Sequence, residues 1–223
     1  MRTSHIISNQ DDLEAFSIIW WQLVKMRLVI SEPERQVVMM ETKKKYGTAS
    51  NGQTYLFNSA SHPLHPWSRH HFTWSGLRFE RLEQCLGIFK ATHFKLSRLA
   101  KVQILGAETG WEVVKILKQQ NIPTNADWSG WGKWLVSNLL SILRQMAMES
   151  PRFRRALLEI REPVIALCTK DKSLGIGADS LPTTEAPELF DRNTWTGRSI
   201  LGEKLMELRG ELLILDNFSS DED

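Results

Sequence analysis

Residues 82–91 read Leu-Glu-Gln-Cys-Leu-Gly-Ile-Phe-Lys-Ala, and this stretch predicts both local structure and chemistry. Its large apolar residues recur with the spacing of one buried helix face, and they are Leu82, Cys85, Leu86 and Phe89. Glu83, Gly87 and Lys90 fall on a neighbouring stripe of the same helix. The sequence therefore predicts a half-buried helix on which a carboxylate and an amine point the same way.

Gly87 lies between these two charged residues, inside the predicted helix, where glycine is unfavourable. Glycine costs about 1 kcal/mol relative to alanine inside a helix, so its presence there indicates a local use. Either a neighbouring helix packs closely against it, or the backbone leaves open space for a ligand.

The rest of the chain shows several amphipathic helical patterns and few strand patterns. We expect helices at 11–29, 83–104, 110–119, from 128 to about 146, from 151 onward and at 200–213. We expect strands at 36–41, 54–58 and 164–168, and a hairpin over 72–79. This balance predicts a mostly helical α+β fold.

At 223 residues, with 42% hydrophobic content, the chain suits one domain with an extension. We expect residues 1–45 to form an N-terminal extension that docks on the domain or on a partner. Residues 46–215 form the domain, with a long loop at 180–193. The acidic tail, 216–223, is expected to be disordered.

Composition limits the partners and the compartment. The net charge is only +2, from 28 basic and 26 acidic residues, which argues against a nucleic-acid-binding module. Cys85 and Cys168 lie in apolar contexts, which predicts reduced, buried thiols in a cytoplasmic protein. The apolar-rich segment 16–30 is too short to span a bilayer, so no membrane association is expected.

Five segments carry residues suited to a ligand site, and they follow one another in a recognisable order. They are Pro-Leu-His-Pro-Trp at 63–67, Glu-Gln…Lys-Ala at 83–91, Trp128, Asp-Lys-Ser-Leu-Gly-Ile-Gly at 171–177, and Trp-Thr-Gly-Arg-Ser-Ile-Leu-Gly at 195–202 followed by Leu-Met-Glu-Leu-Arg at 205–209. Together they resemble the signatures of the NADAR family, also called YbiA-like. The resemblance covers roughly residues 54–213 and implies a single compact YbiA-like domain with a few short strands.

The resemblance also implies a function. NADAR proteins act on N-glycosidic bonds, either removing ADP-ribose from guanine or cleaving early intermediates of riboflavin synthesis. By this resemblance the chain is expected to be an N-glycosyl hydrolase that needs no cofactor. Glu83 and Lys90 would face the substrate, and Asp171 would complete the catalytic set.

These residue types suit the cleavage of a ribosyl C–N bond. A carboxylate such as Glu83 stabilises positive charge at the anomeric carbon or activates water. Lys90, with its pKa lowered by burial, would be a nucleophile toward the ring-opened sugar or a phosphate contact. The alternative is that both residues form a charged stripe on a solvated helix face.

Further positions are expected to bind substrate. Trp67 matches a family aromatic, and Gly87 would give space. Gly175 and Gly177 would let backbone approach a ligand, and Asp171 would bond a ribose hydroxyl or be only a turn residue.

Two tryptophans and two arginines complete the candidate set. Trp128 matches a family residue, but its helical stripe favours core packing, whereas Trp195 is the better candidate for stacking on a flat ring. Arg198 is expected to contact phosphate. Arg209 would do the same or form a structural ion pair.

Four histidines lie close together in the sequence and could indicate a metal site; they are His62, His65, His70 and His71. No cysteine stands nearby at ligand spacing, so no metal is expected.

Four departures from the family signatures qualify the expected activity. Where the family signatures have tryptophan, glutamate and asparagine, this chain has Leu174, Ala166 and Ser199, respectively. In addition, Pro66 interrupts the first motif. These changes support an alternative in which the domain binds ADP-ribose, a nucleotide or a protein without turnover.

Overall fold

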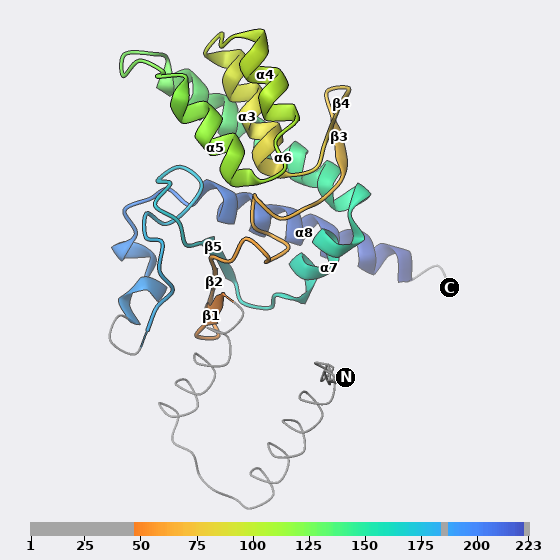
Figure 1. Cartoon of the computed structure of the whole chain (residues 1–223). Coiled ribbons are helices and arrows are strands. Elements are labelled where there is room, and N and C mark those ends of the chain that lie inside the picture. Colours follow the sequence, from red (N-terminus) through yellow and green to blue (C-terminus); the bar gives the residue numbers. More distant parts are fainter. Residues whose placement is uncertain (1–46, 184–186, 221–223) are drawn as a thin grey trace, which may run out of the picture. The chain divides into compact units, whose positions relative to one another are not determined.

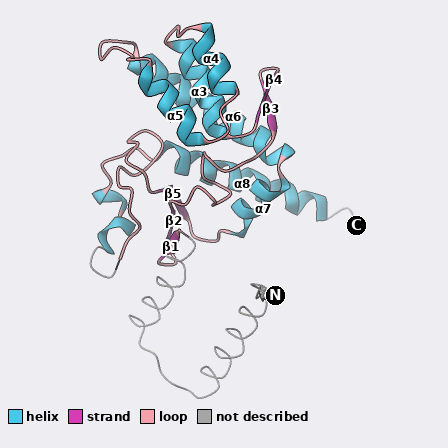
Figure 2. Cartoon of the chain, viewed as in Figure 1, coloured by secondary structure: helices cyan, strands magenta, loops and turns pink. Residues whose placement is uncertain are grey.

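The computed structural model describes residues 47–183 and 187–220, which form six helices and five short strands. Figures 1 and 2 show their arrangement. The helices are α3 (Leu82–His93), α4 (Arg98–Leu105), α5 (Gly110–Gln119), α6 (Trp128–Glu149), α7 (Pro151–Glu159) and α8 (Ile200–Ser220). This content confirms the mostly helical α+β fold expected from the sequence.

A three-stranded sheet joins segments that are far apart in sequence. Its strands are β1 (Thr48–Ser50), β2 (Thr54–Phe57) and β5 (Val164–Leu167), in the order β1-β2-β5. The pair β1–β2 is antiparallel and the pair β2–β5 is parallel. The register places Leu56 opposite Ala166, so the centre of the sheet carries small and apolar side chains.

The predicted hairpin is present as β3 (Phe72–Trp74) and β4 (Leu77–Phe79). Its two turn residues, Ser75 and Gly76, have φ angles of 49° and 74°. Two successive positive φ angles fit the right-handed twist of a two-residue hairpin.

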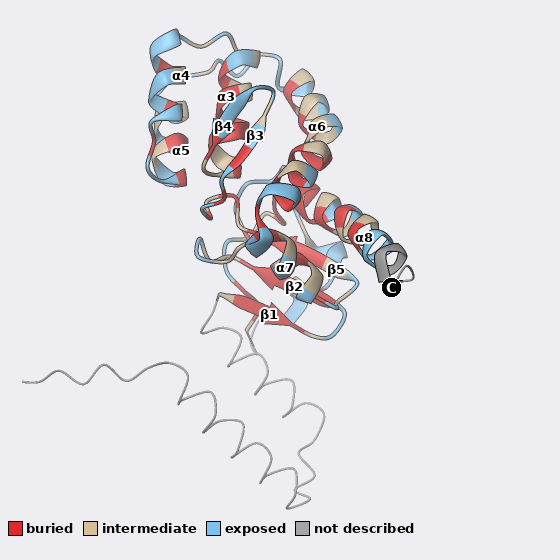
Figure 3. Ribbon diagram, turned by 90° about the vertical axis from the view of Figure 1, so that its right-hand side faces the viewer, coloured by how far each residue is buried: buried red, intermediate tan, exposed pale blue. Residues whose placement is uncertain are grey.

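The long helix α6 lies at the centre of the apolar core. Its buried residues follow the predicted stripe, and they are Trp131, Leu135, Leu139, Leu140, Ile142, Leu143, Met146 and Ala147. Helix α8 packs against both α6 and β5, while α3, α4 and α5 pack on one another. Figure 3 shows the buried faces of α6, α8 and the sheet turned toward each other.

Several boundaries differ from the prediction. Residues 48–50 form a strand that the sequence pattern did not predict. Two short 3-10 turns, Pro187–Phe190 and Arg192–Thr194, lie in the expected loop at 180–193 or at its end. Helix α8 continues to Ser220, so the tail expected to be disordered from residue 216 begins as helix. The extension at 1–45 and the strand at 36–41 lie outside the described residues. Among the helices that are described, none is long and apolar enough to cross a membrane.

The helix expected at 83–104 is two helices, and Lys95 explains the break. Lys95 has a φ angle of 53°, the left-handed conformation that ends many helices. The N–H of Lys95 donates to the Thr92 carbonyl at 3.1 Å, and the N–H of Leu96 to the Ala91 carbonyl at 2.8 Å. These two bonds form a Schellman motif. Ser97 then caps α4 by accepting from the Ala100 N–H.

Replacing Lys95 with glycine is expected to stabilise the chain. Glycine removes the steric cost of the left-handed conformation, about 1–2 kcal/mol, but loses about 0.4–1 kcal/mol through a more flexible unfolded state. The net gain is about 0.5–1 kcal/mol, measurable by urea unfolding. Lys115→Gly, at an exposed helical position in α5, is the matched control and should destabilise by about 1 kcal/mol. A loss of stability in Lys95→Gly would contradict this account of the helix break.

Candidate functional site

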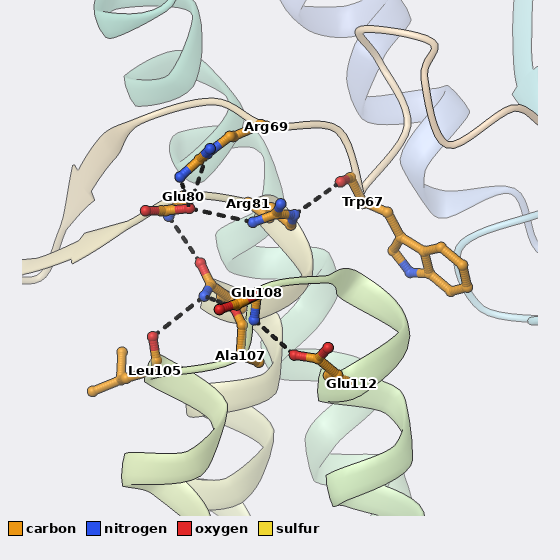
Figure 4. Close-up of polar contacts among 9 residues, drawn as sticks. Trp67, Arg69, Glu80, Arg81, Leu105, Ala107, Glu108 and Glu112 are labelled. Atoms are coloured by element: carbon orange, nitrogen blue, oxygen red, sulfur yellow. Dashed lines mark hydrogen bonds and ion pairs between the residues drawn. The ribbon is translucent and has the colours of Figure 1, made fainter.

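The beginning of α3 is fixed by a polar network that joins three parts of the chain (Figure 4). Gln84 is buried; its Oε1 accepts from the Glu80 N–H at 2.9 Å and its Nε2 donates to the Ala107 carbonyl at 2.8 Å. The backbone N–H of Glu83 donates to the Pro66 carbonyl at 3.0 Å. The segment 63–67 and α3 are therefore held together where Glu83 lies.

Glu83 lies in an environment that disfavours its charge. The pKa of the Glu83 carboxyl is raised from 4.5 to about 7, chiefly by burial and in addition by the negative charge of Asp171. Lys90 and a hydrogen bond from the Trp67 side chain act in the opposite direction on this pKa. Near neutral pH the carboxyl therefore populates both of its protonation states, as a group that moves protons requires.

Lys90 responds to the same neighbours. Burial lowers the pKa of the Lys90 amine, and the charges of Asp171 and Glu83 partly restore it. A lowered pKa increases the fraction of neutral, nucleophilic amine at neutral pH. Because Glu83 and Lys90 act on each other and both sense Asp171, we call these three residues the charge cluster.

Asp171 has two roles. One of its oxygens, Oδ1, accepts from the N–H groups of Ser173 and Leu174 at 2.7 and 2.9 Å, as expected of a turn residue. Its side chain is exposed, yet its charge acts on both Glu83 and Lys90. The local turn therefore holds a carboxylate close enough to influence the charge of the other two members of the charge cluster.

The aromatic residues around Lys90 reverse one expectation. The Lys90 Nζ lies 5.0 Å from the centre of the Trp128 ring and 6.0 Å from that of Trp131. Trp128 is 40% exposed, so it lies at the edge of the core rather than inside it. Its ring is available both to Lys90 and to a flat ligand.

Trp195, the expected stacking residue, is instead structural. Its indole Nε1 donates to the Leu189 carbonyl at 2.8 Å, and its ring packs on a small apolar cluster. That cluster consists of Ala49, Leu56, Ala166, Cys168, Ile176 and Leu181. No contact recorded for Trp195 in the described part of the chain reaches the charge cluster.

Gly175 and Gly177 allow close approach of protein backbone rather than of a ligand. A Cβ at Gly175 would lie 2.7 Å from the Leu167 carbonyl oxygen, and one at Gly177 would lie 2.9 Å from the Gly197 nitrogen. The N–H of Gly197 donates to the Ile176 carbonyl, so the segments 171–177 and 195–202 are joined directly. Their glycines are thus explained by this packing.

The close-packing explanation also holds for Gly87. A Cβ at this position would lie 2.7 Å from Val113 Cγ1 and 3.2 Å from Ile104 Cγ2. The expectation of open space for a ligand beside Gly87 is wrong, because α4 and α5 fill that face of α3.

Gly87→Ala is therefore expected to destabilise the chain by about 1–3 kcal/mol, because the methyl group overpacks a filled interface. Gly210→Ala is the matched control, since nothing lies within 4 Å of a Cβ there and the residue is in the exposed part of α8. The control should gain up to about 1 kcal/mol. Urea unfolding of both variants measures the difference, and equal stabilities would contradict the packing.

The two arginines have different environments. Arg209 is structural, because its Nη1 donates to the carbonyls of Ile160 and Glu162 at 2.8 Å each. Arg198 is exposed, and its Nη1 lies 4.0 Å from the position of a Cβ at Gly132. Gly132 follows Trp131, so Arg198 reaches the end of α6 that carries the aromatic residues near Lys90.

Three of the clustered histidines make hydrogen bonds that hold their loop in place. His62 Nδ1 accepts from the Leu64 N–H, His65 Nδ1 accepts from the Trp67 N–H, and the two nitrogens of His70 pair with Ser150 Oγ and the Pro63 carbonyl. Within 47–183 and 187–220, no three metal-binding side chains gather.

None of the four departures from the family signatures is itself a member of the charge cluster, but two of them contact it. The Pro66 carbonyl accepts from the Glu83 N–H, and the Leu174 N–H donates to Asp171 Oδ1. Ala166 and Leu174 are buried in the two apolar clusters of the core. Ser199 is buried with a φ angle of 51°, a conformation that asparagine adopts more readily than serine. These changes therefore alter core packing and backbone strain.

A separate surface hollow of about 540 Å³ contains none of the charge cluster. It is lined by Gly52, Tyr55, His62, Pro63, Ala156, Glu159, Ile160, Arg161 and Glu162.

Sequence reasoning identified the three charged residues but missed several of their supports. The ring of Trp131 lies near Lys90 although its helical spacing indicated only core. The structural use of Gln84 depends on a contact with Ala107, which is distant along the chain, so no local pattern could have revealed it.

The fold of this chain is similar to that of a solved structure. The NMR structure of the E. coli protein YbiA is similar to this chain, with a TM-score of 0.52 and 16% sequence identity, over 78% of this chain and 93% of YbiA. Protein-family models and curated proteins gave no match. The chain thus has a YbiA-like fold, as the sequence motifs predicted.

Proposed function

We propose that this YbiA-like domain is an N-glycosidase that cleaves the bond between a base and a ribose or ADP-ribose. The observation that carries the proposal is the mutual electrostatic influence of Glu83, Lys90 and Asp171. Shifted pKa values of an acid and an amine, beside an exposed aromatic ring, are typical of catalytic sites.

In this proposal Glu83 controls charge and protons during bond cleavage. Positive charge develops at the anomeric carbon as the C–N bond breaks, and a nearby carboxylate stabilises it. A pKa of about 7 also lets Glu83 accept a proton and return it at neutral pH.

Lys90 acts on the opened sugar. In the ring-opened form of the N-glycoside, the anomeric carbon is joined to the base nitrogen as an imine. Attack by the neutral Lys90 amine on this carbon forms a new C–N bond. As the old C–N bond breaks, both hydrogens of the amine pass to the base nitrogen, so the base leaves as a free amine and Lys90 keeps the imine. Water then adds to the lysine imine and releases the free sugar aldehyde and the amine.

Substrate recognition would use the residues next to the charge cluster. Trp128 offers an exposed ring for a flat base, and Trp67 contacts Glu83 directly. Arg198 is a cation suited to phosphate at the same end of α6.

The test is release of free base from ADP-ribosylated guanosine and from riboflavin-pathway intermediates by the full chain, followed by chromatography. The proposal expects base release from at least one of them. Binding of ADP-ribose in calorimetry without base release from either class would support the alternative, a binding module without turnover.

A further inference from the structure

His65 is placed to control the orientation of Trp67. Its ring Nδ1 accepts from the Trp67 backbone N–H at 3.1 Å, two residues further along the chain. The His65 ring also contacts the Trp67 ring edge-on, with centroids 5.4 Å apart and an angle of 78° between the planes. One side chain therefore fixes both the backbone and the indole of Trp67.

Trp67 is in turn tied to the beginning of α3. Arg81 Nε donates to the Trp67 carbonyl at 3.1 Å (Figure 4). The Trp67 ring rests on Gly110, where a Cβ would lie 2.3 Å from the indole Cγ. A further contact of Trp67 affects the chemistry of the site. Its side chain hydrogen-bonds the Glu83 carboxyl and lowers the pKa of that group.

From these contacts we infer that His65 is a positioning residue, which aims the Trp67 indole N–H at the Glu83 carboxyl. The bond from the Trp67 N–H to the His65 ring spans two residues, the geometry in which asparagine, aspartate, serine and threonine side chains also accept. Burial lowers the pKa of His65 to about 4, so its ring stays neutral and its Nδ1 stays an acceptor near neutral pH.

The inference rests on the proposed function for its kinetic test only. A ¹³C NMR titration of the Glu83 carboxyl tests it without any substrate. In His65→Ala the pKa of Glu83 should rise by about 0.7 pH unit, the equivalent of one ordinary hydrogen bond. Trp67→Phe should give the same rise, and the double variant should add nothing further, because both changes remove one interaction.

The matched control is His65→Asn, whose Oδ1 keeps the acceptor while the ring is lost. It should restore the pKa of Glu83 to the wild-type value. His65→Phe keeps a ring without an acceptor and should behave like His65→Ala, so it replaces that variant if alanine prevents folding. If base release is detectable, kcat in His65→Ala should fall about 10-fold and recover in His65→Asn.

Two results would overturn the inference. One is a Glu83 pKa in both His65→Ala and His65→Phe that equals the wild-type value. The other is a pKa in His65→Asn that rises as far as in His65→Ala. Absence of base release in the wild-type chain would overturn the proposed function instead, and the NMR result would still stand.

Discussion

Replacing Lys90 with alanine is expected to lower the rate of base release at least about 100-fold, because the variant loses the amine that attacks the sugar. Lys90 lies at the face of α3 that meets Trp128, and its charge is already disfavoured by burial. Alanine should therefore fold well, since it removes a buried amine and leaves the helix intact. Release of free base, measured by chromatography under saturating substrate, gives the rate.

The control for this variant is Lys115→Ala, at an exposed position in α5 that lacks any recorded contact with the charge cluster. It should retain the wild-type rate. Borohydride reduction during turnover should also attach the sugar to Lys90 in the wild-type chain. Equal rates in Lys90→Ala and the wild type would show that the amine takes no part in the reaction.

Glu83→Gln is expected to abolish most base release and at the same time to stabilise the folded chain at alkaline pH. The pKa of Glu83 is raised from 4.5 to about 7 in the folded state. Between these values the unfolded chain is ionised while the folded chain keeps its proton, so raising the pH progressively favours the unfolded state. The wild type therefore loses stability as pH rises from about 4.5 through about 7.

Glutamine removes this penalty, because it is neutral at every pH and similar in shape. The gain at pH 8 is roughly 1–3 kcal/mol, after allowance for the partial exposure of the side chain and for its attraction to Lys90. At pH 4 the two proteins should be nearly equal. Urea unfolding at both pH values measures this, with the exposed Glu203→Gln as a control expected to change stability by less than about 0.5 kcal/mol.

The activity of the wild type has the opposite pH dependence. If the ionised carboxylate of Glu83 stabilises the transition state, the rate rises with pH through about 7. A Glu83→Gln variant that was both fully active and no more stable at pH 8 would contradict the role assigned to this residue.

Periodicity and turn residues predicted the long central helix and the hairpin. The stripe of α6 appears in the structure from Trp131 to Met146, and the Ser75–Gly76 turn closes the hairpin as expected. The break in the helix at Lys95 could not be predicted, because lysine rarely adopts the positive φ angle that this residue has. Likewise β1 is too short to show alternation, and it forms by pairing with β2.

For the candidate site, the spacing along one helix placed Glu83 and Lys90 on the same stripe. It could not show which of the other candidate residues lie near them. Glycines at 87, 175 and 177 gave the same signal for close packing as for ligand space, and the structure supports packing at each. Trp128 is partly exposed although core packing was favoured for it, because exposure depends on which elements cover a residue and not on its local pattern. The Trp195 indole donates to the Leu189 carbonyl, a contact that no local pattern indicated.

The most direct test of the account is a ¹³C NMR titration of the Glu83 carboxyl in the wild type, Lys90→Met and Asp171→Asn. The account predicts a wild-type pKa near 7, a higher value without the Lys90 charge and a lower one without the Asp171 charge. A wild-type pKa near 4.5 that neither substitution moves would contradict the convergence of these three groups, and with it the proposed chemistry.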